Sequence, residues 1–197
     1  MSTAVRWTDL AILTLRAPKD AAAVIIGWQL PQSVLWMAAV LITILSTFMS
    51  ILSNALMPVP EVMAVVLAQP LILCALTMVV FVLGLYVLVW AGRALGGGGE
   101  VDEMLALLVW LQLLRALAGL VALLSVVLLP PLAGLLIFAV GIATIWILLN
   151  FVSVGLQLNS LMSALLVLLI TGFAISFGLA MLLQMLGVSA FGVPPNV

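Results

Sequence analysis

The sequence has very few charged residues, no histidine and a single cysteine. Only 6% of its residues are charged and 68% are hydrophobic, and the mean hydropathy is +1.53. Soluble domains contain about 25% charged residues. A water-facing surface cannot be covered with so little charge, so the chain is predicted to be an integral membrane protein.

The missing residue types also exclude several kinds of chemistry. Without histidine there is no Ser-His or Cys-His catalysis, no histidine haem ligand and no site for most zinc centres. Cys74 is alone in an apolar run, which excludes disulfides and cysteine-based metal sites. The acids and the only lysine, Lys19, lie outside the long apolar runs, so aspartyl and Ser-Lys intramembrane chemistry are excluded as well. We therefore predict a non-enzymatic protein with no catalytic residue, no metal site and no cofactor.

Five apolar runs are each long enough to cross a bilayer, which takes about 20 residues. The predicted spans are residues 34–56, 62–90, 104–129, 132–151 and 160–186. Pro70 is expected to bend the second span, because a proline inside a helix removes one hydrogen bond and crowds the preceding turn. The predicted fold class is all-α, a polytopic membrane protein built as a five-transmembrane-helix bundle.

Residues 1–33 are predicted to form an interfacial amphipathic segment on the cytoplasmic side. Residues 7–13 are expected to start a short helix on the membrane surface, and Pro18 is well placed to start a second helix. Trp28 and Trp36 suit the aromatic belt at the membrane–water interface. The first long apolar run has the length of a full span, so no cleaved signal peptide is predicted.

The few basic residues predict the orientation, because cytoplasmic loops carry an excess of Lys and Arg. Arg6, Arg16 and Lys19 precede the first span and Arg93 follows the second. We expect the N-terminus in the cytoplasm and the tail of residues 187–197 on the opposite side. No clustered basic face exists, so no nucleic acid partner is expected.

Small and polar residues mark the expected inward faces of the spans, because lipid tails give apolar helices no reason to associate. Within a single span, spacings of three, four and seven residues place these residues on one helix face. The predicted polar stripe is Thr43, Thr47, Ser50, Asn54 and Asn150, and the predicted helix-packing residues are Gly134, Gly141, Gly172, Ser176 and Ala180. The last three follow a strict fourth-position spacing that also fits a homodimer contact. The expected partners are membrane lipids and a second copy or another membrane protein.

One charged residue, Arg115, lies near the middle of the third span, about 16 Å from Met104 along the helix. A guanidinium stays charged at any ordinary pH, and at a span centre it costs roughly 2.5–3.5 kcal/mol. Gln112, one turn earlier, is predicted with Arg115 as a lipid or partner contact. Three interpretations remain open. The guanidinium pairs with carbonyls, Asn150 or the polar stripe, binds a lipid phosphate or anionic ligand in a groove, or binds an acid of a partner subunit.

The four glycines at residues 96–99 do not form a phosphate-binding loop, because no Lys and no Ser or Thr follows them. We predict instead that they separate the second span from the third. Glu100, Asp102 and Glu103 then stabilise the start of the third helix through its dipole.

Several loop motifs occur together with a tryptophan in the fourth span. They are Ala17-Pro18-Lys19-Asp20, Gly96-Gly97-Gly98-Gly99-Glu100, Leu129-Pro130-Pro131-Leu132-Ala133-Gly134, Gly155-Leu156-Gln157-Leu158-Asn159-Ser160 and Trp146. Over roughly residues 15–187 this pattern resembles the Yip family of five-helix membrane proteins, first known as Rab-GTPase interactors. It looks most like the bacterial members. The resemblance implies a bacterial inner membrane, a cytoplasmic N-terminus and a periplasmic tail.

The resemblance carries a functional expectation but no catalytic residue. Eukaryotic relatives are linked to vesicle traffic and membrane shaping, and bacterial ones generally have no assigned activity. The cytosolic Asp-Leu-Tyr-Gly-Pro-like segment of eukaryotic relatives is missing, and with it the basis for expecting GTPase binding. The third span has Gln112 and Arg115 in place of a proline that many relatives carry. We expect a Yip-type protein that organises the membrane or a membrane complex through helix and lipid contacts. The alternative is a lipid or small-solute transporter or scramblase with a polar groove around Gln112 and Arg115.

Overall fold

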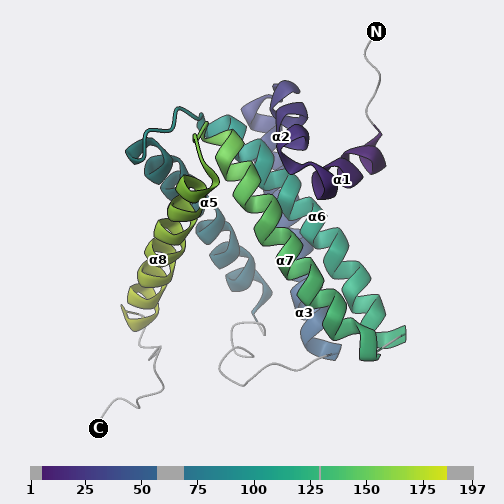
Figure 1. Ribbon diagram of the computed structural model, residues 1–197. Coiled ribbons are helices and arrows are strands. Elements are labelled where there is room, and N and C mark those ends of the chain that lie inside the picture. Colours follow the sequence, from purple (N-terminus) through teal and green to yellow (C-terminus); the bar gives the residue numbers. More distant parts are fainter. Residues whose placement is uncertain (1–5, 57–68, 129, 186–197) are drawn as a thin grey trace.

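The chain is helical wherever the computed structural model describes regular structure (Figure 1). The structure describes residues 6–56, 69–128 and 130–185, and no strand occurs among them. The helices are α1 (Trp7–Arg16), α2 (Pro18–Gly27), α3 (Gln32–Leu56), α5 (Pro70–Ala94), α6 (Val101–Leu128), α7 (Pro130–Gly155) and α8 (Leu161–Met185). Five of them, α3 and α5 to α8, are long and apolar enough to cross a membrane. The predicted all-α, polytopic fold class is confirmed, whereas the first residues of the predicted span 62–90 and the tail at 187–197 lie outside the described residues.

The helix bounds differ from the apolar runs at several ends. Pro70 begins α5, because Gln69 before it has a non-helical backbone, so the expected bend inside a longer helix is wrong. A proline at the first helical position lacks only an N–H that would have no partner there. α5 also continues through Arg93, and α6 begins before Met104. Hydropathy marks where a helix is apolar, but hydrogen bonding continues into the polar residues beyond.

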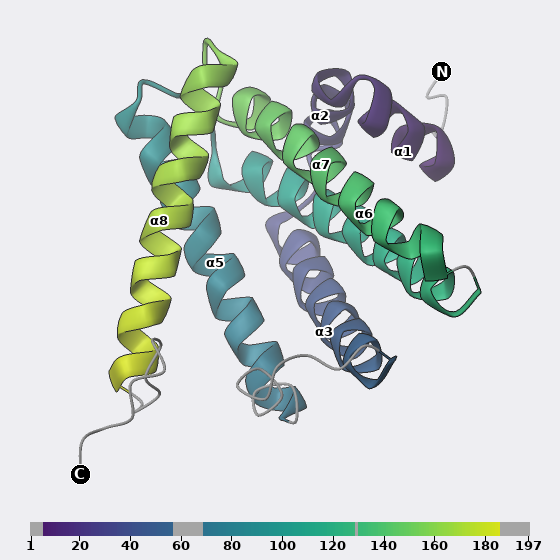
Figure 2. The same cartoon turned by 60° about the horizontal axis from the view of Figure 1, so that its bottom comes forward.

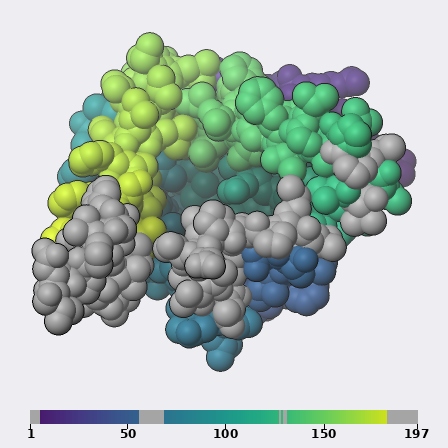
Figure 3. Space-filling model, turned by 90° about the horizontal axis from the view of Figure 1, so that it is seen from below, coloured from purple at the N-terminus to yellow at the C-terminus, as the bar shows by residue number. Residues whose placement is uncertain are grey.

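The long helices converge at one end of the molecule and spread apart at the other (Figures 1 and 2). α6 packs along α7 and α3, and α5 packs along α8 and α3. Most buried side chains lie at the converging end, in residues 84–92, 104–111, 147–158 and 164–167. We call this the packed end and the opposite one the open end. Seen from the open end, the molecule is hollowed between α7 and α8 (Figure 3).

The two short N-terminal helices begin at Trp7 and Pro18, as the sequence predicts, and they pack on the membrane helices. Leu10 of α1 and Ile25 of α2 are buried against α6 and α7. α1 therefore does more than rest on a membrane surface. Its exposed face carries Trp7, which is 67% exposed, together with Ile12 and Leu15, so α1 has apolar residues both where it packs on the chain and where it is exposed.

Three tryptophans join these helices to α6. The ring centroids of Trp7 and Trp28 are 5.7 Å apart, and those of Trp7 and Trp110 are 5.9 Å apart. Aromatic pairs at this separation attract one another beyond the area that they bury. The indole N–H of the buried Trp110 donates a hydrogen bond of 3.0 Å to the hydroxyl of Thr14. α1, α2 and α6 are thus fixed to one another through side chains.

The glycines between α5 and α6 fold tightly against the turn between α7 and α8. Gly96 ends α5 with a left-handed φ of +86°, and the N–H of Gly97 donates to the carbonyl of Gly92 at 2.8 Å. Both features define a Schellman cap, in which a residue without Cβ is favoured. The N–H of Gly98 then donates to the carbonyl of Leu156 at 3.2 Å, across to the other turn.

The closest approach between these loops is at Gly99. A Cβ on Gly99 would overlap the carbonyl oxygen of Gly155 and lie 2.6 Å from the Cα of Leu156. The glycines separate α5 from α6, as predicted, and they also allow backbone-to-backbone contact at the packed end. Asp102 and Glu103 lie in the first turn of α6, as predicted.

Candidate functional site

Arg115 lies where the packed end gives way to the open end. It is 14 residues after Val101, which begins α6, or about 21 Å along the helix axis. Its side chain is exposed in the isolated chain, and the described residues give it no hydrogen bond or ion pair. Pairing with Asn150 or the polar stripe, the first of the three interpretations, is therefore not seen.

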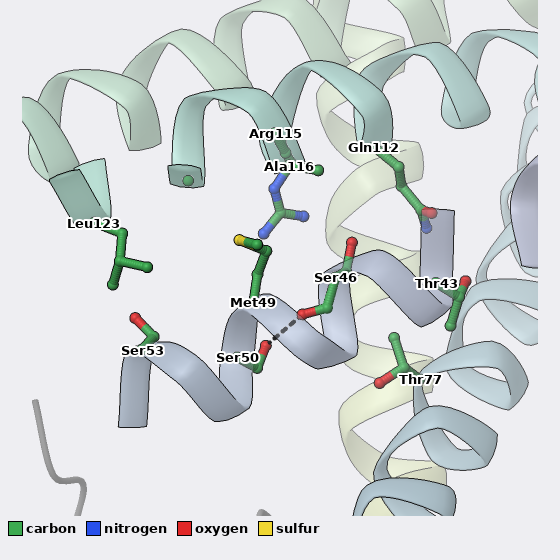
Figure 4. Close-up of a pocket in the computed structure, with 11 residues that line it drawn as sticks. Thr43, Ser46, Met49, Ser50, Ser53, Thr77, Gln112, Arg115, Ala116 and Leu123 are labelled. Carbon is green, nitrogen blue, oxygen red and sulfur yellow. Dashed lines mark hydrogen bonds between the residues drawn. The ribbon is translucent and has the colours of Figure 1, made fainter. Parts of the chain in front are cut away.

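The guanidinium faces a groove of about 360 Å³ between α3 and α6, with one residue from α5. We call it the Arg115 groove. Its lining residues are Thr43, Ser46, Met49, Ser50, Ser53, Thr77, Gln112, Arg115, Ala116, Gly119 and Leu123. Figure 4 shows the side chains of Arg115 and Gln112 pointing from α6 toward α3. Among the described residues of this lining, Arg115 alone is charged.

Three hydroxyls of the groove, those of Thr43, Ser50 and Thr77, already donate within their own helices. Thr43 donates to the carbonyl of Ala39 at 2.8 Å, and Ser50 donates to that of Ser46 at 2.9 Å. A hydroxyl that donates in this way keeps its oxygen lone pairs free to accept. The Oε1 atom of Gln112 is buried and has no hydrogen-bond partner among the described residues. The groove therefore combines one cation with several acceptors.

The predicted polar stripe is only partly gathered at this groove. Thr43 and Ser50 line it, whereas Thr47 is buried and donates to the carbonyl of Thr43 at 2.9 Å. Asn54 is half-buried near the end of α3. Asn150 is 2% exposed on α7, where its amide donates to the carbonyl of Trp146 at 2.8 Å. Asn150 thus satisfies its own helix and takes no part in the groove.

The sequence prediction missed three hydroxyls of the groove. Ser46 and Ser53 continue the spacing of Thr43 and Ser50 at steps of three and four residues, which is the signal that was available. Thr77 comes from α5, and only the fold brings it to α3 and α6. Among the residues that the structure describes, no three His, Cys, Asp or Glu side chains are grouped to hold a metal ion.

A second, larger groove of about 600 Å³ runs between α6 and α7. We call it the Gly141 groove. Most of its lining is small or apolar, and it shares Ser53, Arg115, Gly119 and Leu123 with the Arg115 groove. A Cβ added to Gly119 or to Gly141 would meet no atom within 4 Å. These glycines therefore border open space in the chain.

The family follows from the whole helical region. A model of the Yip1 domain matches residues 12–183, which run from α1 into α8 and include both grooves. The chain belongs to the Yip1 domain family. The resemblance drawn from the loop motifs is thus confirmed, and the protein is a multi-pass membrane protein. No curated protein and no solved structure matches the chain.

The predicted helix-packing residues of this Yip1 domain do not face its interior. Gly134, Gly141, Gly172 and Ser176 are exposed, and Ala180 is half-buried. A Cβ added to Gly134 or Gly172 would also meet nothing within 4 Å. Within one chain these residues border open space, because the helices diverge toward the open end, and their role in helix packing stays a prediction. The homodimer contact along α8 stays a prediction.

Proposed function

We propose that this Yip1 domain protein is non-enzymatic and organises a bacterial inner membrane, or a complex within it, through helix and lipid contacts. The observation that carries the proposal is the exposed small-residue face of α8. Gly172 and Ser176 on that face are exposed, and among the described helices α8 packs mainly on α5 and α7. Small residues let helix backbones approach closely in lipid, so this face suits a second copy or another membrane protein.

The same proposal places the packed end in the cytoplasm and the C-terminal tail in the periplasm. Arg16 and Lys19 lie at the junction of α1 and α2, and Arg93 lies in the last turn of α5. α1 and α2 pack on buried residues of α6 and α7 at the packed end, and Arg93 directly follows residues 84–92 of that end. Cytoplasmic loops are enriched in such residues, which supports this orientation.

Replacing Gly172 with tryptophan is expected to weaken self-association in the membrane by about tenfold, a change of 1.4 kcal/mol. The indole would hold apart two backbones that small residues bring together. Self-association is measured by crosslinking with a reagent that does not react with cysteine, or by energy transfer between labelled copies in vesicles. Phe173→Trp is the matched control, because Phe173 is 74% exposed and already aromatic. Equal association of G172W and the unchanged protein would remove this face as the contact.

A second function, the movement of lipids or small solutes, is favoured by the Arg115 groove. A polar groove at mid-span lowers the cost of bringing a polar group into the hydrocarbon. Against it, transporters are often built from internal repeats, and the sequence shows none.

Arg115→Leu separates the two functions. If the groove moves lipids, the variant should fold normally and flip a fluorescent lipid about tenfold more slowly, since 1.36 kcal/mol of barrier is a factor of ten. Arg93→Leu, at the end of α5, controls for the loss of one arginine. If the unchanged protein is folded but does not flip lipid, transport is excluded. If R115L fails to fold while R93L folds, Arg115 has a structural role.

A further inference from the structure

We propose that the Arg115 groove and the Gly141 groove together bind one anionic phospholipid, with its phosphate on Arg115 and an acyl chain along the Gly141 groove. This inference rests on the proposed function in lipid contacts and names the lipid class and its site. A bound lipid of this kind would be a resident part of the folded protein.

Charge selects the headgroup. Arg115 has no ion pair or hydrogen bond among the described residues, and none of the described residues that line either groove is acidic. A cation in the hydrocarbon region is expensive unless a partner neutralises it. A phosphate accepts paired, charge-assisted hydrogen bonds from a guanidinium. A headgroup with a net charge of one minus matches the site, whereas a zwitterionic headgroup adds a second, unmatched cation.

The hydroxyls of α3 give the headgroup a route to mid-span. Thr43, Ser46, Ser50 and Ser53 all line the Arg115 groove, at successive steps of three, four and three residues. These ten residues of helix cover about 15 Å, which is about half of a 30 Å hydrocarbon core. The row runs from the level of Gln112 toward the end of α3 at the open end (Figure 4). A polar headgroup can therefore reach Arg115 without crossing a wholly apolar surface.

The Gly141 groove suits the acyl part of the same molecule. It is larger than the Arg115 groove, at about 600 against 360 Å³, and its lining is predominantly apolar. The two grooves meet at Arg115 and Gly119, so a phosphate and a chain attached to it fit side by side. Glycines at 119 and 141 keep this space open.

The buried Oε1 of Gln112 further limits which headgroup fits the site. It has no hydrogen-bond partner among the described residues, although it lies one turn from Arg115. An unpaired buried acceptor is costly. The hydroxyls of phosphatidylglycerol supply a donor beside the phosphate, and phosphatidylcholine supplies none. We therefore assign phosphatidylglycerol, or an anionic lipid with the same phosphate and hydroxyl groups, to the site.

The test uses the full chain in mild detergent and native mass spectrometry. Phosphatidylglycerol, phosphatidylcholine with the same acyl chains, and inorganic phosphate are titrated separately. We expect one phosphatidylglycerol to bind about tenfold more tightly than phosphatidylcholine, and Arg115→Gln to abolish that preference, as loss of a charged hydrogen bond implies. Gly119→Leu should weaken the binding of both lipids by filling the shared groove. Gly134→Leu is the matched control, because its added side chain also meets open space but lies in neither groove.

Each outcome decides the matter. Equal retention of the two lipids by the unchanged protein overturns the proposal without reference to any variant. Binding of inorganic phosphate as tight as that of the lipid shows a free-anion site and overturns the lipid assignment. Weakened binding in G134L as well as G119L also overturns it. Self-association is measured on the same preparations. If the unchanged protein shows the lipid preference but does not self-associate, the result counts against the proposed function. If it self-associates but shows no lipid preference, the result counts against this site.

Discussion

Replacing Gly99 with alanine is expected to lower the free energy of unfolding by about 3 kcal/mol, the upper end of the usual cost of overpacking. The added methyl would overlap the carbonyl oxygen of Gly155 and press on the Cα of Leu156. Backbone atoms cannot turn aside as a side chain can, so the α5–α6 loop must move away from the α7–α8 turn. Thermal unfolding of the detergent-solubilised protein measures the effect.

Gly98→Ala is the matched control for this prediction. Its added methyl would lie 3.1 Å from Oε1 of Gln157, the far end of a flexible side chain that can rotate away. We expect a loss of less than about 1 kcal/mol for this variant, close to an ordinary surface substitution. If Gly99→Ala were as stable as Gly98→Ala, the backbone contact between the two loops would not hold the packed end together.

Replacing Trp110 with alanine is expected to release α1 and α2 from the membrane helices, at a cost of about 3–5 kcal/mol. The substitution removes a buried indole, its hydrogen bond to Thr14 and its stacking on Trp7. The exposed Arg16 at the end of α1 provides the readout. Trypsin should cleave after Arg16 much faster in the variant. Mass spectrometry of the released peptide measures the cleavage rate.

Two further substitutions separate the parts of this effect. Trp110→Phe keeps a ring but loses the hydrogen bond, so it should cost about 1 kcal/mol from that bond. Trp146→Ala removes a tryptophan that is 49% exposed on α7 and should leave the cleavage rate unchanged. An unchanged rate in W110A would mean that α1 and α2 are held by other contacts.

The N-terminal helices and the five long helices follow from local sequence features. Apolar runs of span length need internally bonded backbones in lipid, so they form helices in any fold. Pro18 begins α2 because its ring suits the first helical position, and the same physics places Pro70 at the start of α5. The start of α5 was predicted wrongly. The apolar run continues on both sides of Pro70, so hydropathy gives no sign that a helix begins there.

The role of the glycines at 96–99 and of Gly155 depends on two loops that are more than 50 residues apart. A glycine run looks the same in sequence whether it separates helices or lets two backbones touch. Close approach is decided by the partner loop, here the turn that carries Leu156. For the same reason Gly141 was expected to pack against another helix, but within one chain it borders a groove.

The sequence by itself determined that this protein is a helical membrane protein of the Yip1 domain family, and that one arginine lies midway along a span. Those features depend on composition, on run length and on motifs within single loops. Only the tertiary structure decided that the helices converge at one end and spread at the other. The divergence exposes Arg115 to two joined grooves and leaves Gly172 exposed. Spacing along a helix fixes which residues share a face, whereas the angle between helices fixes what that face meets.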